Sequence, residues 1–308
     1  MHLPRYAELL ERGDAPPGSS WGLFGADDRI GTLNLVGPEQ ARAAADCVRT
    51  GESFTLDYPL DAFDPPLAPT RRAPVHRVFS RHADHRDDLL DGFYLQASTQ
   101  LDGLRHRRHH VHGFYNGVPD GDDLGIHHWA ERGIVARGLL LDVSAAAEHA
   151  EGRGVSAANL QSALDKQGVT PQPGDVLLLH TGWADWYQTA GTGQQERVRA
   201  ERRFTGVEQT HEVLAWLWDH HFAAVVSDTY AFEMLPARSD SPFGGETDHG
   251  MMHQQLIALL GLAVGELWRL GPLAAVCARD DRWTCLLTAK PLNLRGGVGS
   301  PANATAVR

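Results

Sequence analysis

Short apolar segments separated by helical patterns constrain the fold of this chain more than any other feature of its sequence. Segments rich in Leu, Val and other apolar residues occur at residues 54–60, 138–143, 175–181, 223–228 and 284–292. Short apolar segments of this kind are typical of buried strands. Because helical patterns alternate with some of them, the sequence predicts a mixed α/β fold. Neither composition nor periodicity determines the order of the strands.

The expected helices are identified by their capping residues. They span residues 38–49, 157–166, 207–218 and 248–260. Pro38 occupies a first helical position, where a missing N–H removes no hydrogen bond. Ser156 can cap the second helix, and Thr205 with Glu208 forms a capping box ahead of the third. No internal repeat or low-complexity linker interrupts this pattern.

Length, charge and cysteine content restrict the class of protein. A chain of 308 residues with 42% hydrophobic residues can bury a sizeable core in one domain or two. A formal net charge of −11 argues against nucleic acid, whose phosphates require clustered Lys and Arg. Cys47, Cys277 and Cys285 form no CxxC pair, and no segment approaches the ~20 apolar residues of a membrane span. We therefore expect a cytoplasmic protein with no membrane and no nucleic-acid partner.

One segment in the first half of the chain has the spacing of a metal-binding site. Gln96, Gln100 and Asp102 stand at positions i, i+4 and i+6, and His106 follows four residues later. In an extended segment alternate residues share a face, so the two amides and the carboxylate can converge. Taken alone, such a pattern more often marks Gln side chains bonded to nearby backbone and an Asp that caps a turn, here at Gly103.

Separated segments of the chain resemble, in the same order, the cyclase family that includes bacterial kynurenine formamidase and isatin hydrolase. That family has His-x-x-x-His-x-Asp-x-x-x-His where this chain has Gln96, Gln100, Asp102 and His106, so two histidines are replaced by Gln. The other similar segments are 21–22, 28–35, 114–117, 124–126, 129–135, 137–142, 181–183, 228–229, 291–294 and 296–301. Together these segments are spread over roughly residues 20 to 302, nearly the whole length of the chain.

The resemblance implies a fold and an assembly. The fold is a single α/β domain of the kynurenine-formamidase type (swivelling β/β/α), in which a central β-barrel-like core carries flanking helices. We expect this domain to span residues 1–308, with residues 1–20 as an N-terminal arm and 303–308 as a C-terminal tail. The family also implies a homo-oligomer, either a dimer or a tetramer.

The resemblance implies a metal site as well, because the first three positions of the family's motif hold a divalent metal. The corresponding ligands here are Gln96, Gln100 and Asp102. Asp102 is the ligand that is retained, and a carboxylate suits almost any divalent ion. An amide oxygen is neutral, harder than imidazole and a poor zinc ligand. The oxygen-rich set shifts the preference from Zn²⁺ towards Mn²⁺, Mg²⁺ or Ca²⁺; a weak site or none is the alternative.

Catalytic residues follow from the same resemblance. His106 matches a family histidine that lies beside the metal and moves protons, a role for which the pKa of imidazole is suited. His253 and Glu266 match a His and a Glu that reach the same cavity, as ligands of a second metal or as acid–base partners. Asp102 and His253 should therefore approach one cavity. Glu233 is a weaker candidate, for which a structural ion pair is at least as consistent.

Three residues are predicted to contact a small-molecule substrate. Arg105 can hold a substrate carboxylate in bidentate fashion, although a surface salt bridge is an equal alternative. Tyr115 and Asn116 lie in one of the family-like segments, and we expect them to line the binding site.

These residues lead to three functional hypotheses. The first is a metal-dependent hydrolase of a small cyclic or aryl amide, lactam or lactone, with Mn²⁺, Mg²⁺ or Zn²⁺ as its cofactor. The second is a metal-independent acid–base enzyme (a cyclase, dehydratase or isomerase of small-molecule metabolism) in which the amides orient the substrate. The third is a member that binds a small ligand without catalysis.

Overall fold

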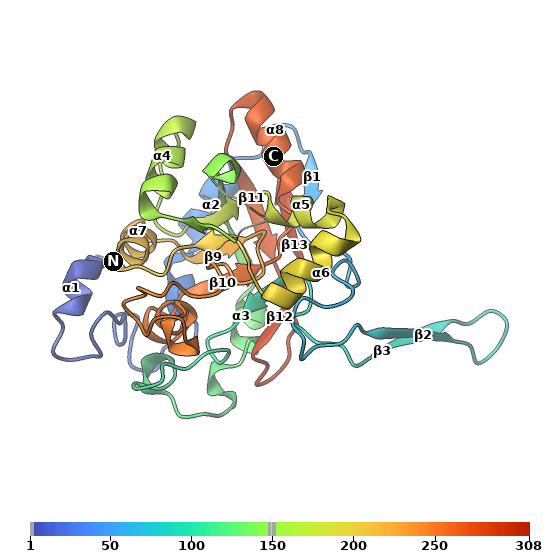
Figure 1. Ribbon diagram of the computed structural model, residues 1–308, viewed down its shortest axis with the longest axis horizontal. Helices are drawn as coiled ribbons and strands as arrows, with labels where there is room; N and C mark the ends of the chain where they lie inside the picture. Colours follow the sequence, from blue (N-terminus) through green and yellow to red (C-terminus); the bar gives the residue numbers. More distant parts are fainter. Residues whose placement is uncertain (1–2, 147–148, 150–151) are drawn as a thin grey trace.

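A computed structural model describes residues 3–146, 149 and 152–308 of the chain (Figure 1). Within these residues one nine-stranded sheet organises the molecule, in the order β1-β13-β11-β5-β7-β9-β10-β4-β12. The sheet curls into a half-barrel with helices around it, so the predicted α/β single-domain architecture is confirmed. In chain order the strands of this sheet are β1 (Ser53–Thr55), β4 (Gln100–Asp102), β5 (Ile134–Asp142), β7 (Val176–His180), β9 (Ala224–Ser227), β10 (Ala263–Glu266), β11 (Thr284–Ala289), β12 (Gly299–Pro301) and β13 (Ala304–Val307).

The middle of the sheet consists of the parallel strands β5, β7, β9 and β10. Every residue of β7, β9 and β10 is buried. Strands covered on both faces read as continuous apolar runs, which is why sequence pattern predicted β5, β7 and β9. The ends are less accurate: β1 covers only the start of predicted strand 54–60, and β11 ends at Ala289.

Helices surround this sheet and contact its central strands. The helices α2, α4 and α8 each contact β5, and α4 also contacts α7. Ser156 caps α4 as predicted, since its Oγ accepts a hydrogen bond from Asn159 N at 3.2 Å. The helices are α1 (Tyr6–Leu10), α2 (Pro38–Ala45), α3 (His127–Arg132), α4 (Ala157–Gln167), α5 (Trp183–Thr189), α6 (Thr192–Glu201), α7 (His211–Asp219) and α8 (Gly271–Asp280). Short 3₁₀ turns are η1 (Gly31–Leu35), η2 (Tyr115–Gly117), η3 (Asp122–Leu124) and η4 (Ser144–Ala146). No helix of the described part of the chain has the length and apolar character needed to cross a bilayer.

Two predicted helices differ from the observed structure. The helix expected over 207–218 begins instead at His211, where Thr210 caps α7, because Gly206–Val207 forms strand β8 beside β6 (Gly154–Val155). The helix expected over 248–260 is a 3₁₀ turn, η5 (Asp248–Gly250), followed by a π-helix, η6 (Gln254–Leu259). Between them the backbone N–H groups of Met252 and His253 donate hydrogen bonds to the buried carboxylate of Glu233.

Both expected terminal extensions are packed into the domain, which corrects that prediction. In the N-terminal segment, Tyr6 N donates to Asp219 Oδ1 of α7 at 2.7 Å, and Leu9 is fully buried. Residues 303–308 are not a tail, because β13 pairs with both β1 and β11. Arg308 is buried, and its Nη2 lies 2.9 Å from Asp280 Oδ1.

A two-stranded hairpin projects from the body of the molecule (Figure 1). It consists of β2 (Val75–Phe79) and β3 (Asp87–Asp91), which pair with each other and form a sheet of their own. Every residue of both strands is exposed. An isolated two-stranded hairpin is marginally stable in water, so this element lacks the packing that stabilises the rest of the fold.

Candidate active site

The antiparallel pairing of β4 with β10 brings together three polar side chains. Gln100 lies directly opposite Glu266 and Asp102 lies opposite Val264, so Gln100, Asp102 and Glu266 share one face of the sheet. Gln100 Nε2 donates a hydrogen bond to Glu266 Oε2. All three side chains are buried, although strand residues with such groups usually face water.

His253 joins these residues from the segment that precedes η6. Its Nε2 lies 3.0 Å from Glu266 Oε1 and 4.0 Å from Asp102 Oδ2. The potential ligand atoms of Asp102, His253 and Glu266 all lie within 4.8 Å of one another. We call these three residues the carboxylate–imidazole group. The predicted approach of Asp102 and His253 to one cavity is confirmed.

A buried carboxylate, Glu233, fixes the orientation of His253. Its Oε1 accepts hydrogen bonds from His253 Nδ1 at 2.5 Å and from His253 N at 2.9 Å. Its Oε2 accepts from Met252 N at 2.6 Å and from Gln209 Nε2 at 2.8 Å. Nδ1 is therefore a donor, and Nε2 is the ring nitrogen that faces Asp102 and Glu266. Glu233 therefore forms a structural ion pair with His253, which was the alternative to a catalytic role in the sequence analysis.

The burial of opposite charges shifts the pKa values within this group. Burial alone would lower the pKa of His253, but hydrogen bonds with Glu233 and Glu266 outweigh it and raise the pKa to about 10. Burial, with the nearby charge of Asp102, raises the pKa of Glu266 to about 7 against the opposing effect of His253. Near neutral pH the imidazole is therefore charged and Glu266 is close to its titration point.

His106 and Gln96 lie beside the carboxylate–imidazole group. Gln96 Nε2 donates to Asp102 Oδ1 at 3.3 Å and lies 3.0 Å from His106 Nδ1. Burial lowers the pKa of His106, with Asp102 opposing the shift, so its imidazole is neutral at pH 7. Gly299, opposite Asp102 on β12, leaves the room that Gln96 needs, because a Cβ there would lie 2.8 Å from Gln96 Nε2.

The donor set fits a divalent metal ion. Among the described residues, Gln100 Oε1 and Asp102 Oδ2 are buried oxygens without a hydrogen-bond donor. Unsatisfied buried acceptors are costly, and a cation between them would remove that cost. The residues nearest such an ion are Asp102, His253 and Glu266, with the Gln100 oxygen as a further donor. The predicted ligand Gln96 lies beside this set, whereas His253 and Glu266, predicted as catalytic, are part of it.

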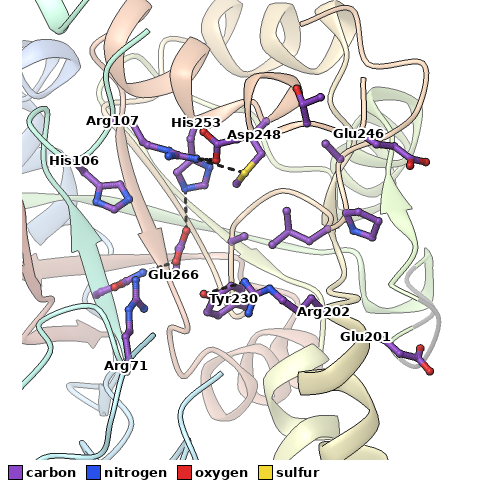
Figure 2. Close-up of a pocket in the computed structure, with 17 residues that line it drawn as sticks. Arg71, His106, Arg107, Glu201, Arg202, Tyr230, Glu246, Asp248, His253 and Glu266 are labelled. Atoms are coloured by element: carbon purple, nitrogen blue, oxygen red, sulfur yellow. Dashed lines mark hydrogen bonds and ion pairs between the residues drawn. The ribbon is translucent and has the colours of Figure 1, made fainter. Parts of the chain in front are cut away.

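Three residues of this set, Gln100, His253 and Glu266, line a cavity of about 440 Å³ (Figure 2). The cavity is the size of a small-molecule site. Loops 230–237 and 246–251 form much of its wall. Arg107 crosses one side, where its Nη2 lies 2.5 Å from Asp248 Oδ1. The predicted catalytic residues His106, His253 and Glu266 all line the cavity.

Arg105 does not reach this cavity. Its Nη1 donates to Gly296 O at 2.6 Å and to Asp122 Oδ1 at 3.1 Å, and its Nη2 lies 3.4 Å from Asp120 Oδ1. The salt bridge, which was the alternative to a substrate contact, is therefore the observed arrangement.

Tyr115 and Asn116 were also expected to contact substrate, and the structure contradicts this. Tyr115 is fully buried, and its hydroxyl donates to Asp28 Oδ2 at 2.9 Å. Asn116 Nδ2 donates to Gly25 O at 2.9 Å, and its Oδ1 accepts from Gly22 N at 2.9 Å. Both side chains are used to hold the segment around residues 22–28 against the domain.

Arg71 and Arg202 are among the residues of the cavity wall that sequence reasoning missed. Arg71 lies in a Pro-rich stretch that resembles an ordinary surface loop, and Arg202 ends a polar helix. Neither position carries a local signal, because both reach the site through the tertiary fold.

Comparison with known proteins identifies the family. The Cyclase family model, described as "Putative cyclase", matches residues 59–234. A solved structure described as a novel cyclase is 31% identical to this chain, covers 94% of it and 99% of its own chain, and has a TM-score of 0.80. This chain belongs to the cyclase family.

More distant solved structures share the fold. Isatin hydrolase A from Ralstonia solanacearum has a TM-score of 0.59 at 16% identity, over 87% of this chain and 95% of that chain. Isatin hydrolase A from Labrenzia aggregata, bound to benzyl benzoate, has a TM-score of 0.57 at 17% identity, and the match covers 85% of this chain and 94% of that chain. A search of curated proteins found no match. The predicted family resemblance is thus confirmed.

Proposed function

We propose that this protein is a metal-dependent hydrolase of a small cyclic or aryl amide, lactam or lactone. The observation that carries the proposal is the buried carboxylate–imidazole group beside a cavity of about 440 Å³. Two unsatisfied buried oxygens in the same place support a bound cation. The fold shared with isatin hydrolases supports hydrolysis of a cyclic amide.

The metal would be held by Asp102, Glu266 and Nε2 of His253, with Gln100 Oε1 as a further oxygen donor. When bound, a divalent ion supplies Lewis acidity to a substrate carbonyl. Because oxygen atoms dominate the set, Mn²⁺ or Mg²⁺ is favoured over Zn²⁺.

The chain's own residues orient the site and move protons. Glu233 holds His253 Nδ1–H, so Nε2 is presented to the two carboxylates. His106 is neutral and lines the cavity, so its imidazole can accept a proton from water and return it to the leaving group. Gln96 contacts His106 Nδ1 and keeps the ring beside Asp102.

A second function is favoured by one observation, the pKa of about 7 at Glu266 next to a charged His253. A carboxyl that titrates near neutral pH can act as a general acid and base without metal. In that case Gln96 and Gln100 would orient the substrate, and the reaction would be a cyclisation, dehydration or isomerisation.

Metal content and turnover measured together test the first proposal. Protein purified without chelator should hold about one Mn²⁺ or similar ion per chain, and Asp102→Ala should lose both the ion and turnover of isatin, formanilide and lactone substrates. Asp123→Ala, an exposed carboxylate on η3, is the matched control. Metal-free protein with unaltered activity in Asp102→Ala and Glu266→Ala would refute the proposal. Activity that survives prolonged chelation but needs Glu266 would favour the second function.

A further inference from the structure

Two arginines on the cavity wall form no salt bridge with the described residues. They are Arg71, from the loop after β1, and Arg202, at the C-terminal end of α6. Among the described residues, no carboxylate oxygen lies within 4.0 Å of either guanidinium, in contrast to Arg107, which pairs with Asp248. A guanidinium that faces a cavity without a salt-bridge partner can bind a planar anion.

Arg202 is held in place by neutral contacts that leave its charge available. Its Nη1 donates to Leu67 O at 3.0 Å, and its Nη2 lies 3.4 Å from Tyr230 Oη. Its guanidinium carbon lies 5.3 Å from the ring centre of Tyr230 and 5.6 Å from that of Phe204. The residue also adopts a left-handed backbone conformation, with φ of 54°, which favours Gly or Asn. The fold therefore keeps an arginine here at some conformational cost.

Arg71 approaches the same cavity from another segment. Its Nη1 donates to the backbone oxygen of Gln96, and its positive charge lowers the pKa values of both Glu266 and His106. In Figure 2, Arg71, Tyr230 and Arg202 lie along one side of the cavity, and His253 and Glu266 lie beyond them. Arg71 and Arg202 thus line the same cavity as His253 and Glu266.

The other residues that line the cavity indicate which chemical groups the rest of the ligand carries. Apolar side chains from Ala231, Leu235, Pro236 and Met251 line the cavity together with the ring of Tyr230. An aromatic or short aliphatic body suits these walls, and about 440 Å³ limits its size. The glutamates at the rim, Glu201 and Glu246, are exposed to solvent, where screening weakens their repulsion of an anion.

We propose that this cavity selects small molecules that carry a carboxylate in addition to the bond that reacts, with Arg71 and Arg202 binding that carboxylate. The inference deepens the proposed hydrolase function, because it adds the substrate class, but the anion site itself does not depend on metal. Tyr230 would contribute its hydroxyl and its ring to the same ligand.

Binding of a matched acid and amide tests this directly. The probes are 4-fluorobenzoate and 4-fluorobenzamide, followed by ¹⁹F NMR on the full chain, both chelator-treated and Mn²⁺-loaded. The acid should bind at least about tenfold more tightly than the amide in the chelator-treated protein, where it cannot coordinate metal. Arg202→Gln and Arg71→Gln should each weaken the binding of the acid by about tenfold or more and leave the affinity for the amide unchanged.

The neighbouring arginines provide matched controls. Arg203→Gln and Arg72→Gln remove the same charge one residue away, from side chains that do not line the cavity. Arg202→Lys, which keeps the charge but not the planar fork, should recover part of the lost affinity. Arg71 also offsets the charge of Glu266, whereas Arg202 is not among the main causes of the pKa shifts of Glu266 and His106, so Arg202 is the decisive position.

Several results would overturn the inference. They are equal affinity for acid and amide, no binding of the acid up to about 10 mM, equal losses in the control variants, or acid binding that appears only with Mn²⁺. Failure of the hydrolase proposal looks different, because Asp102→Ala would then keep its activity and metal content while the arginine-dependent selectivity for the acid persisted.

Discussion

The hydrogen bonds between Glu233 and His253 allow a quantitative prediction. Glu233→Gln keeps the shape of the side chain but removes its charge, and one amide oxygen must then replace a carboxylate that accepts four hydrogen bonds. The rise of the pKa of His253 from 6.5 to about 10 corresponds to about 5 kcal/mol of preference for the charged imidazole in the folded protein. Glu233 and Glu266 share this effect, so we expect the substitution to lower the free energy of unfolding by about 3 kcal/mol at pH 6.

The pH dependence follows from the sign of the shift. The pKa of His253 is raised in the folded state, so its stabilising contribution is complete below 6.5 and disappears as pH rises through about 10. The difference in stability between the native chain and Glu233→Gln should therefore shrink between pH 6.5 and pH 10. Urea denaturation of the two metal-free proteins across this pH range measures the difference in their free energies of unfolding. Groups that titrate in the same way in both proteins do not contribute to this difference.

An exposed glutamate supplies the control for this experiment. Glu196→Gln, on the surface of α6, should change the free energy of unfolding by less than about 0.5 kcal/mol at any pH in the range. If Glu233→Gln is as stable as the native chain at pH 6, or if its deficit is the same at pH 6 and above pH 10, the assignment of Glu233 as the ionic partner of His253 is wrong.

Three further predictions concern metal, ligand set and assembly. Metal must displace the proton on His253 Nε2, so Mn²⁺ affinity measured by calorimetry should rise about tenfold per pH unit between pH 7 and pH 10, and a flat profile would contradict this. Replacing both Gln96 and Gln100 by His should raise Zn²⁺ affinity by about tenfold or more, because imidazole is the stronger zinc ligand; no gain in bound zinc, measured by elemental analysis, would place both amides outside the metal set. We also propose that the chain is a homo-oligomer stabilised by the β2–β3 hairpin, whose exposed apolar side chains (Val75, Val78, Phe79, Leu89 and Leu90) would be buried between copies. Sedimentation should show a dimer or tetramer that becomes a monomer when residues 75–91 are replaced by a short Gly-Ser turn, and an intact chain that is already monomeric at micromolar concentration would exclude it.

The central strands and the family could be predicted from sequence because their signals are local. Strands buried on both faces must be continuously apolar, so β7 and β9 are visible as runs such as 176–179 and 224–226. Asp102, His253 and Glu266 stand in family-like positions, and that resemblance predicted their convergence, which the structure confirms.

Tertiary structure alone decided how those residues are used. The segment just before the π-helix is held by Glu233, twenty residues before His253 in the chain, which accepts hydrogen bonds from the backbone N–H groups of Met252 and His253. The last residues form strand β13 because they pair with both β1 and β11, two strands that lie far apart from each other in the sequence. Arg202 reaches the cavity through the end of α6 and its contact with Tyr230. Burial and hydrogen bonding between distant segments set these roles, and a residue's neighbours in sequence carry no record of such contacts.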